Sequence, residues 1–140
     1  MEFAASTTIS AHPDKVWEVL TDTERYPEWD PYCEKIEGQV ALGNKIKAFS
    51  RLAPGRGFKV KVVELDSARR MTWRGGAPLG LFRGVRTFTL EHTADGTTAF
   101  TLREVFSGPM LKLVAKSLPD MSEAFEAFAA GLKQRCEGAA

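Results

Sequence analysis

The chain has 140 residues, 44% of them hydrophobic and 10% aromatic, which indicates one globular domain over residues 1–140 with a sizeable core. Its 19 basic and 18 acidic residues give a net charge of +1, so the overall balance points to neither a nucleic-acid partner nor an anionic membrane. Cys33 and Cys136 lie far apart and His12 and His92 are isolated, so we expect reduced thiols, no metal and no cofactor. A disulfide between the two cysteines is the alternative. No apolar run has the length of a membrane span and no signal peptide is evident, so a cytoplasmic location is the default expectation.

The N-terminal part of the chain predicts a strand, a short helix and a corner. Residues 2–10 alternate between apolar and polar positions, as a strand does. Residues 11–22 predict a short helix with a proline in its first turn. Residues 25–32, RYPEWDPY, combine one helical turn with a corner, because Pro27 and Pro31 interrupt any longer helix.

The middle of the chain has the alternation and the turn signals of about six strands. The expected strands cover residues 34–40, 45–52, 58–65, 69–75, 85–93 and 97–108. The glycine-rich segment 75–84 is predicted to be a loop. Ala94, Asp95 and Gly96 are predicted to be a hairpin loop with Gly96 in the left-handed conformation.

The C-terminal part predicts a long helix, because apolar residues recur there at intervals of three and four. This stripe consists of Val114, Leu118, Met121, Phe125, Phe128, Leu132 and Cys136. Pro119 lies inside the pattern, so the helix should kink or restart near Leu118. An antiparallel meander followed by one long amphipathic helix is α+β, with the helix covering one face of the sheet.

These segments resemble the START-like superfamily, also called SRPBCC, the helix-grip or Bet v 1-like fold, which includes polyketide cyclase/dehydrase-like proteins and lipid-transfer domains. The resemblance rests on HPDKVWEVLTD, RYPEWDPY, FRGVRTFTLEHTADGTTAFTLREVFSG and a closing helix that ends in LKQRCE, and it covers nearly the whole chain. It implies a curved antiparallel sheet of six to seven strands around a long C-terminal helix, with two short helices after the first strand. It also implies a cavity between sheet and helix that takes a hydrophobic or amphipathic small molecule, with RYPEWDPY at one end.

The predicted hairpin fixes which side chains face each other. If the apolar residues of both strands point to the buried side, Phe88 opposes Leu102 and Leu90 opposes Phe100. The same pairing brings Arg86 opposite Glu104 on that face. A buried charge needs a partner, so an ion pair that fixes the register is one interpretation. The other is a polar anchor, with Arg86 holding a carboxylate, phosphate or enolate oxygen of a ligand.

The residues expected to line the cavity come from the corner, the strands and the last helix. They are Arg86, Glu104, Trp29, Tyr26, Trp73, Phe88, Leu90, Phe100, Leu102, Leu118, Met121, Phe125 and Phe128. For the apolar members, plain core packing is the alternative.

Three functions are compatible with these features. The favoured one is binding of a lipid, fatty acid or polyketide-like molecule, which needs only the cavity. The second is a polyketide cyclase or dehydratase, with Glu104 as base and Arg86 stabilising an enolate. Against it, a glutamate paired with an arginine stays ionised and is a weak base. In the relatives that the resemblance suggests, the position of Arg86 often carries histidine, which puts a histidine-type base in doubt.

The third function is a protein-interaction module of the same fold. Leu79, Leu81 and Phe82 lie in the glycine-rich segment. If they are exposed, they are suited to a homodimer or membrane contact.

Overall fold

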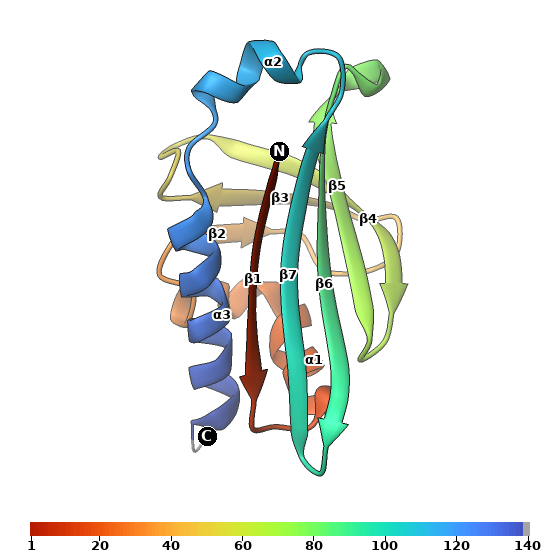
Figure 1. Ribbon diagram of the computed structural model, residues 1–140, viewed down its shortest axis with the longest axis vertical. Helices are drawn as coiled ribbons and strands as arrows, with labels where there is room; N and C mark the ends of the chain where they lie inside the picture. Colours follow the sequence, from red (N-terminus) through yellow and green to blue (C-terminus); the bar gives the residue numbers. More distant parts are fainter. Residues whose placement is uncertain (139–140) are drawn as a thin grey trace.

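The computed structural model describes residues 1–138, the side chain of Pro78 excepted. Its strands form a curved seven-stranded antiparallel sheet in the order β1-β7-β6-β5-β4-β3-β2 (Figure 1). The strands are β1 Glu2–Ile9, β2 Cys33–Glu37, β3 Lys45–Ser50, β4 Gly57–Asp66, β5 Arg70–Ala77, β6 Phe82–Ala94 and β7 Thr97–Ser107. The helices and 3-10 turns are α1 Pro13–Thr21, η1 Thr23–Glu28, η2 Pro78–Gly80, α2 Leu111–Val114, η3 Ala115–Ser117 and α3 Ser122–Glu137. The predicted α+β helix-grip architecture is confirmed.

The N-terminal elements follow their local sequence. His12 caps α1, because its Nδ1 accepts a hydrogen bond from the Asp14 amide at 3.1 Å, and Pro13 takes the first helical position. The second short helix is the 3-10 turn η1, which contains Pro27 and ends at the corner before β2. The RYPEWDPY segment is therefore one helical turn and a corner, as predicted.

The hairpin of β6 and β7 has the predicted register. Phe88 pairs with Leu102, Leu90 with Phe100, and Arg86 with Glu104. The loop is one residue shorter than expected, because Ala94 already pairs with Thr97 and a bulge after His92 absorbs the extra residue. Gly96 has a φ of +70°, the left-handed conformation that the turn requires.

The expectation of a loop over residues 75–84 is wrong for most of that segment. β5 continues to Ala77 and β6 begins at Phe82, so only η2 and one further residue connect them. The glycines do not break the strands, because Gly75 pairs directly with Gly84 inside the sheet. Paired glycines remove two side chains from one row of the sheet without removing the ladder hydrogen bonds.

The C-terminal stripe is interrupted, as its proline predicts. Leu118 has an extended backbone, which is the conformation favoured before a proline, and it separates the short helices α2 and η3 from α3. Helix α3 lies beside β1 (Figure 1) and buries Phe125, Phe128, Ala129, Leu132 and Cys136. At the other end, α2 and η3 contain no buried residue.

One glycine sets how closely the corner approaches α3. Gly131 lies in the middle of the helix, where glycine is normally unfavourable. A Cβ at this position would overlap the backbone carbonyl oxygen of Trp29. The corner segment therefore packs directly on the helix backbone, and Gly131 is what makes that approach sterically allowed.

Candidate functional site

A row of side chains crosses the concave face of the sheet. Strand pairing places Phe3 opposite Glu104, Glu104 opposite Arg86, and Arg86 opposite Trp73. Directly paired residues of an antiparallel sheet point to the same face. Trp73 and the neighbouring Phe88 are buried, which identifies this face as the inner one. The predicted charged pair is therefore on the inner side of the sheet.

The Arg86–Glu104 ion pair is short, and both of its side chains are partly exposed to solvent. The Arg86 Nε donates a hydrogen bond to the Glu104 Oε1 at 2.6 Å. The Arg86 side chain is 30% exposed and that of Glu104 is 13% exposed. The guanidinium also lies 5.0 Å from the centre of the Phe125 ring, a cation–π distance. Only one guanidinium nitrogen is used in this pair, so Arg86 retains donors for a further acceptor.

The interior below this pair, toward the β6–β7 turn, is filled by aromatic side chains. The Phe128 ring lies 5.7 Å from that of Tyr26, 4.9 Å from Trp29 and 6.0 Å from Phe88, between centroids. Leu90, Phe100 and Leu102 are buried in the same cluster. The structure thus brings these expected wall residues together as a packed core, and at this level the space between sheet and helix is occupied.

The inner face above the pair carries fewer side chains. Gly75 and Gly84 contribute no side chain there, and a Cβ on Gly84 would lie 3.1 Å from the Glu104 Oε2. The rings around it are Phe82 and Phe106, which stack at 5.7 Å. Phe58, which alternation places on the same face, is exposed. This upper inner face, an apolar surface with a charged floor, is the candidate ligand site.

Leu118 and Met121 close this region only in part. Both are partly buried and both precede α3, so they are not on the helix face where the sequence pattern placed them. Met121 packs against the core at the helix N-terminus. Of the predicted helix residues, Phe125 alone contacts the charged pair through a ring.

The sequence interpretation missed a buried carboxyl in the corner. Asp30 is buried, and its Oδ1 accepts one hydrogen bond from the Tyr32 amide at 3.1 Å. Burial raises the pKa of this carboxyl, and the positive charges of Arg86 and Arg51 oppose the shift. The available signal was its place in RYPEWDPY, where an acid between aromatic and proline residues has little access to water.

Three other polar groups near the core are distinctive. The Tyr26 hydroxyl donates a hydrogen bond to the Leu20 carbonyl, and burial raises its pKa well above the ordinary value. The indole N–H groups of Trp29 and Trp73 are buried without an acceptor in residues 1–138. A buried donor without a partner is destabilising by about 1–3 kcal/mol.

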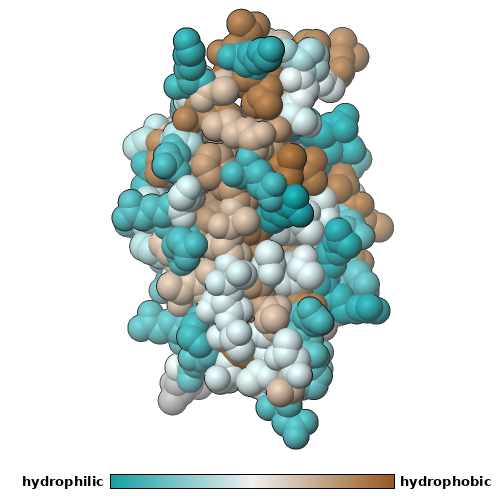
Figure 2. Space-filling view, in the orientation of Figure 1, coloured by the Kyte–Doolittle hydropathy of each residue, from teal (hydrophilic) through white to brown (hydrophobic). Residues whose placement is uncertain are grey.

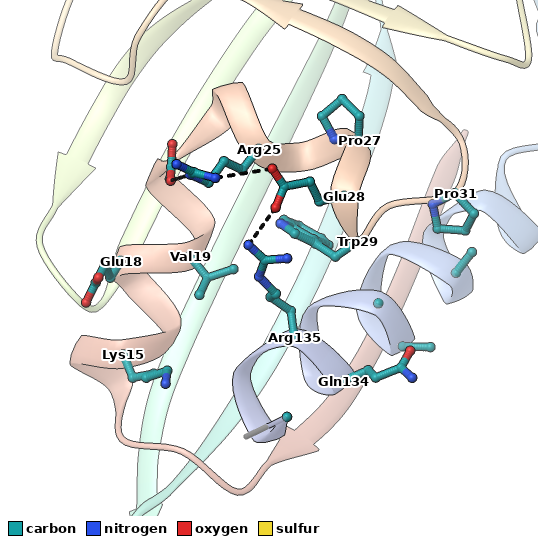
Figure 3. A pocket seen from close by; sticks show the side chains of 15 residues that line it. Lys15, Glu18, Val19, Arg25, Pro27, Glu28, Trp29, Pro31, Gln134 and Arg135 are labelled. Carbon is teal, nitrogen blue, oxygen red and sulfur yellow. Dashed lines mark hydrogen bonds and ion pairs between the residues drawn. The ribbon is translucent and has the colours of Figure 1, made fainter. Parts of the chain in front are cut away.

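A groove of about 1150 Å³ lies elsewhere, on the outside of the molecule between α1, η1 and α3 (Figure 3). Across it the Arg135 Nη2 donates to the Glu28 Oε1 at 2.7 Å, and Arg25 contacts the other Glu28 oxygen at 3.3 Å. The hydrogen bond from Arg135 lowers the pKa of Glu28. The charges of Arg25, Glu28 and Arg135 in this groove are thus paired with one another.

Cys33 and Cys136 are free and buried. Of the helices in residues 1–138, none combines the length and apolar composition that crossing a bilayer requires.

The seven-stranded grip around α3 defines a START-like fold. The chain belongs to the family described as polyketide cyclase / dehydrase and lipid transport, which matches residues 1–137. Family and fold together make it a START-like, polyketide cyclase-like ligand-binding domain. No curated protein matches the sequence significantly.

Solved structures share the fold at low sequence identity. A hypothetical protein from Helicobacter pylori is 17% identical, with a TM-score of 0.78 over 97% of this chain and 88% of that one. Truncated norcoclaurine synthase from Thalictrum flavum is 17% identical, with a TM-score of 0.71 over 100% of this chain and 95% of that one. A START superfamily protein from Mycobacterium smegmatis is 17% identical, with a TM-score of 0.70 over 97% of each chain.

Proposed function

We propose that this chain, acting as one domain, binds a hydrophobic or amphipathic small molecule on the upper inner face, with Arg86 as the anchor for an anionic group. The observation that carries the proposal is the Arg86–Glu104 pair, which is partly exposed on an otherwise apolar face. The exposed part of the Arg86 side chain leaves its guanidinium within reach of a ligand. The free, buried thiols suit a reducing compartment, so we propose a cytoplasmic location.

The surroundings of the pair favour a ligand with an apolar body. Phe82, Phe106 and Phe125 provide aromatic surface on one side. The paired glycines at positions 75 and 84 place no side chain beside it. A fatty acid or polyketide-like acid combines an anionic head for Arg86 with a body for these rings.

Two ligands that differ mainly in charge test whether Arg86 is the anchor. We would measure binding of a long-chain fatty acid and of its methyl ester by tryptophan fluorescence and by calorimetry. Arg86→Leu should weaken binding of the acid by about tenfold or more and leave the ester nearly unchanged. The control is Arg103→Leu, because Arg103 makes an exposed ion pair with Glu2 on the outer face of the same hairpin. Equal weakening of acid and ester in Arg86→Leu would refute the anchor.

The apolar wall has its own test. Phe125→Trp enlarges a ring that lies against Arg86, so bulky ligands should be excluded before slender ones. The affinity ratio of a branched to a linear acid should fall in this variant. An unchanged ratio would remove Phe125 from the wall.

The second candidate is the cyclase or dehydratase activity, and one observation favours it. Glu104 forms an ion pair with Arg86. Asp30 is a buried carboxyl whose pKa is raised by burial, although the positive charge of Arg86 opposes that shift. Removal of a proton from carbon to form an enolate would suit the Asp30 carboxylate better than Glu104, because a raised pKa makes a stronger base. Isotope exchange at the acidic carbon of a β-diketone, lost in Asp30→Asn, would support this activity. No exchange above buffer would leave binding as the function.

A further inference from the structure

Three leucines are exposed at the end of the molecule that carries α2 and η2. Leu79 is 96% exposed, Leu113 77% and Leu81 40%. The two segments are joined there, because the Met110 amide donates a hydrogen bond to the Leu81 carbonyl at 2.9 Å. Figure 1 shows α2 and the turn after β5 together at the top, and Figure 2 shows hydrophobic surface at that end. We call this surface, formed by Leu79, Leu81 and Leu113, the apolar tip.

The backbone conformation of Leu79 is also unusual for a leucine. Leu79 has a φ of +62°, a left-handed conformation that is unfavourable for a leucine. Its neighbour Gly80 has a φ of +68°, for which glycine is well suited. An apolar side chain held outward in such a conformation gains neither burial nor backbone stability within this chain. Contact of this side chain with an apolar phase outside the protein explains both its exposure and its unfavourable backbone conformation.

The charged residues of the two segments that form the tip all have one sign. Residues 67–90 and 105–119, which supply both segments, contain no aspartate or glutamate. Arg83, Lys112 and Lys116 are exposed, and none of them forms an ion pair within residues 1–138. Some exposed cations elsewhere have acidic partners, as in the pairs Lys35–Glu37 and Lys133–Glu137. Others, such as Lys45 and Lys61 on the β3–β4 pair, form no ion pair within residues 1–138 either. The near-neutral net charge of the chain thus conceals a locally basic end.

We propose that the apolar tip docks this protein on an anionic lipid surface, with its leucines in the headgroup region and Arg83, Lys112 and Lys116 against lipid phosphates. Exposed apolar side chains ringed by cations are the combination that peripheral binding to anionic bilayers requires. A second copy of the chain is a poorer occupant. A symmetric dimer through this tip would bring two groups of unpaired cations together.

Co-sedimentation with vesicles tests the docking. The probes are vesicles of phosphatidylcholine alone and of phosphatidylcholine with phosphatidylglycerol. We expect binding to the mixed vesicles only, and weaker binding at high salt, because the electrostatic attraction is screened. Each lysine removed at the surface should reduce the partition coefficient about fivefold.

Matched variants separate the apolar from the basic part. Leu79→Asn with Leu113→Asn should abolish binding, and asparagine tolerates the left-handed conformation at position 79. The control is Leu42→Asn, an exposed leucine in the connection between β2 and β3. Lys112→Gln with Lys116→Gln should weaken binding to mixed vesicles, whereas Lys45→Gln with Lys61→Gln on the β3–β4 pair should not.

Several outcomes would overturn the proposal. They are absence of binding to mixed vesicles, equal binding to both vesicle types, or equal loss in the control variants. A concentration-dependent dimer in size-exclusion chromatography that Leu113→Asn disrupts would assign the tip to a second copy instead. Circular dichroism of each variant distinguishes a lost contact from a lost fold. Because the ligand assays on Arg86 use no vesicles, failure of docking leaves the proposed binding function standing.

Discussion

Arg86 and Glu104 face each other across the two strands of the β6–β7 hairpin, with Nε and Oε1 2.6 Å apart. Their pairing joins the fold to the candidate site, because the same register that packs Phe88 against Leu102 brings the charges together. Altering either residue therefore tests both stability and binding.

A double-mutant cycle should measure the coupling of this pair. Arg86→Leu leaves a mostly buried carboxylate without its cation, so unfolding in urea should show a loss of about 2 kcal/mol. The double variant Arg86→Leu/Glu104→Leu should lose less than the two single variants together, since it leaves no unpaired charge. Simple additivity would show that solvent already screens the pair.

Gly131→Ala should destabilise the protein, against the general preference of helices for alanine. Propensity alone predicts a gain of about 1 kcal/mol from this substitution. The overlap of the added Cβ with the Trp29 carbonyl predicts a net loss instead. Ala130→Gly, at an exposed position next along the same helix, is the control and should cost about 1 kcal/mol. If Gly131→Ala raised the melting temperature, the direct contact between corner and helix would be wrong.

Asp30 should make stability fall as the pH rises. Its pKa is raised from an ordinary value of 3.8, so the folded state holds the proton more tightly than the unfolded state does. Between the ordinary and the raised pKa the free energy of unfolding therefore decreases with increasing pH. Asp30→Asn keeps the acceptor for the Tyr32 amide and removes this slope, which denaturant titrations across that pH range would detect.

Glu28 should change the stability with pH in the opposite direction to Asp30, and it serves as the reference. Its pKa is lowered by the hydrogen bond from Arg135, so its stabilising contribution is lost as the pH falls. The difference between wild type and Glu28→Gln should accordingly grow with increasing pH. The same direction for Asp30→Asn and Glu28→Gln would contradict the raised pKa of Asp30.

Both cysteines should resist alkylation in the folded protein. Burial raises the pKa of Cys33 to about 12 and that of Cys136 to about 11. The thiolate is the reactive form, so iodoacetamide at mildly alkaline pH should label neither residue until denaturant is added. Mass spectrometry would report the labelling, and modification of one thiol in native buffer would place that thiol outside the core.

The hairpin was predictable because its constraints are local. A strand alternates strictly with period two, and the Asp95-Gly96 turn fixes the offset, so the partners of Phe88, Leu90 and Arg86 follow directly. The helix break was predictable for a similar reason, since Pro119 restricts the residue before it. Both inferences need only covalent geometry and neighbours in sequence.

The remaining features depend on how distant segments meet. Aromatic residues that suit a cavity wall equally suit a filled core, and only the packed rings around Phe128 show which they form. The seclusion of Asp30 and the close approach of Trp29 to Gly131 depend on the position of the corner against α3. The 75–84 segment was misjudged because glycines that signal a loop can also pair inside a sheet.

The lack of buried residues in α2 and η3 has a consequence for engineering the protein. A segment that contributes nothing to the core opens at a small fraction of the free energy of global unfolding. Its length and composition can therefore change without a large loss of stability. A fluorescent label or a short peptide inserted near Lys116 should report on events at this end while the grip of the sheet on α3 stays intact.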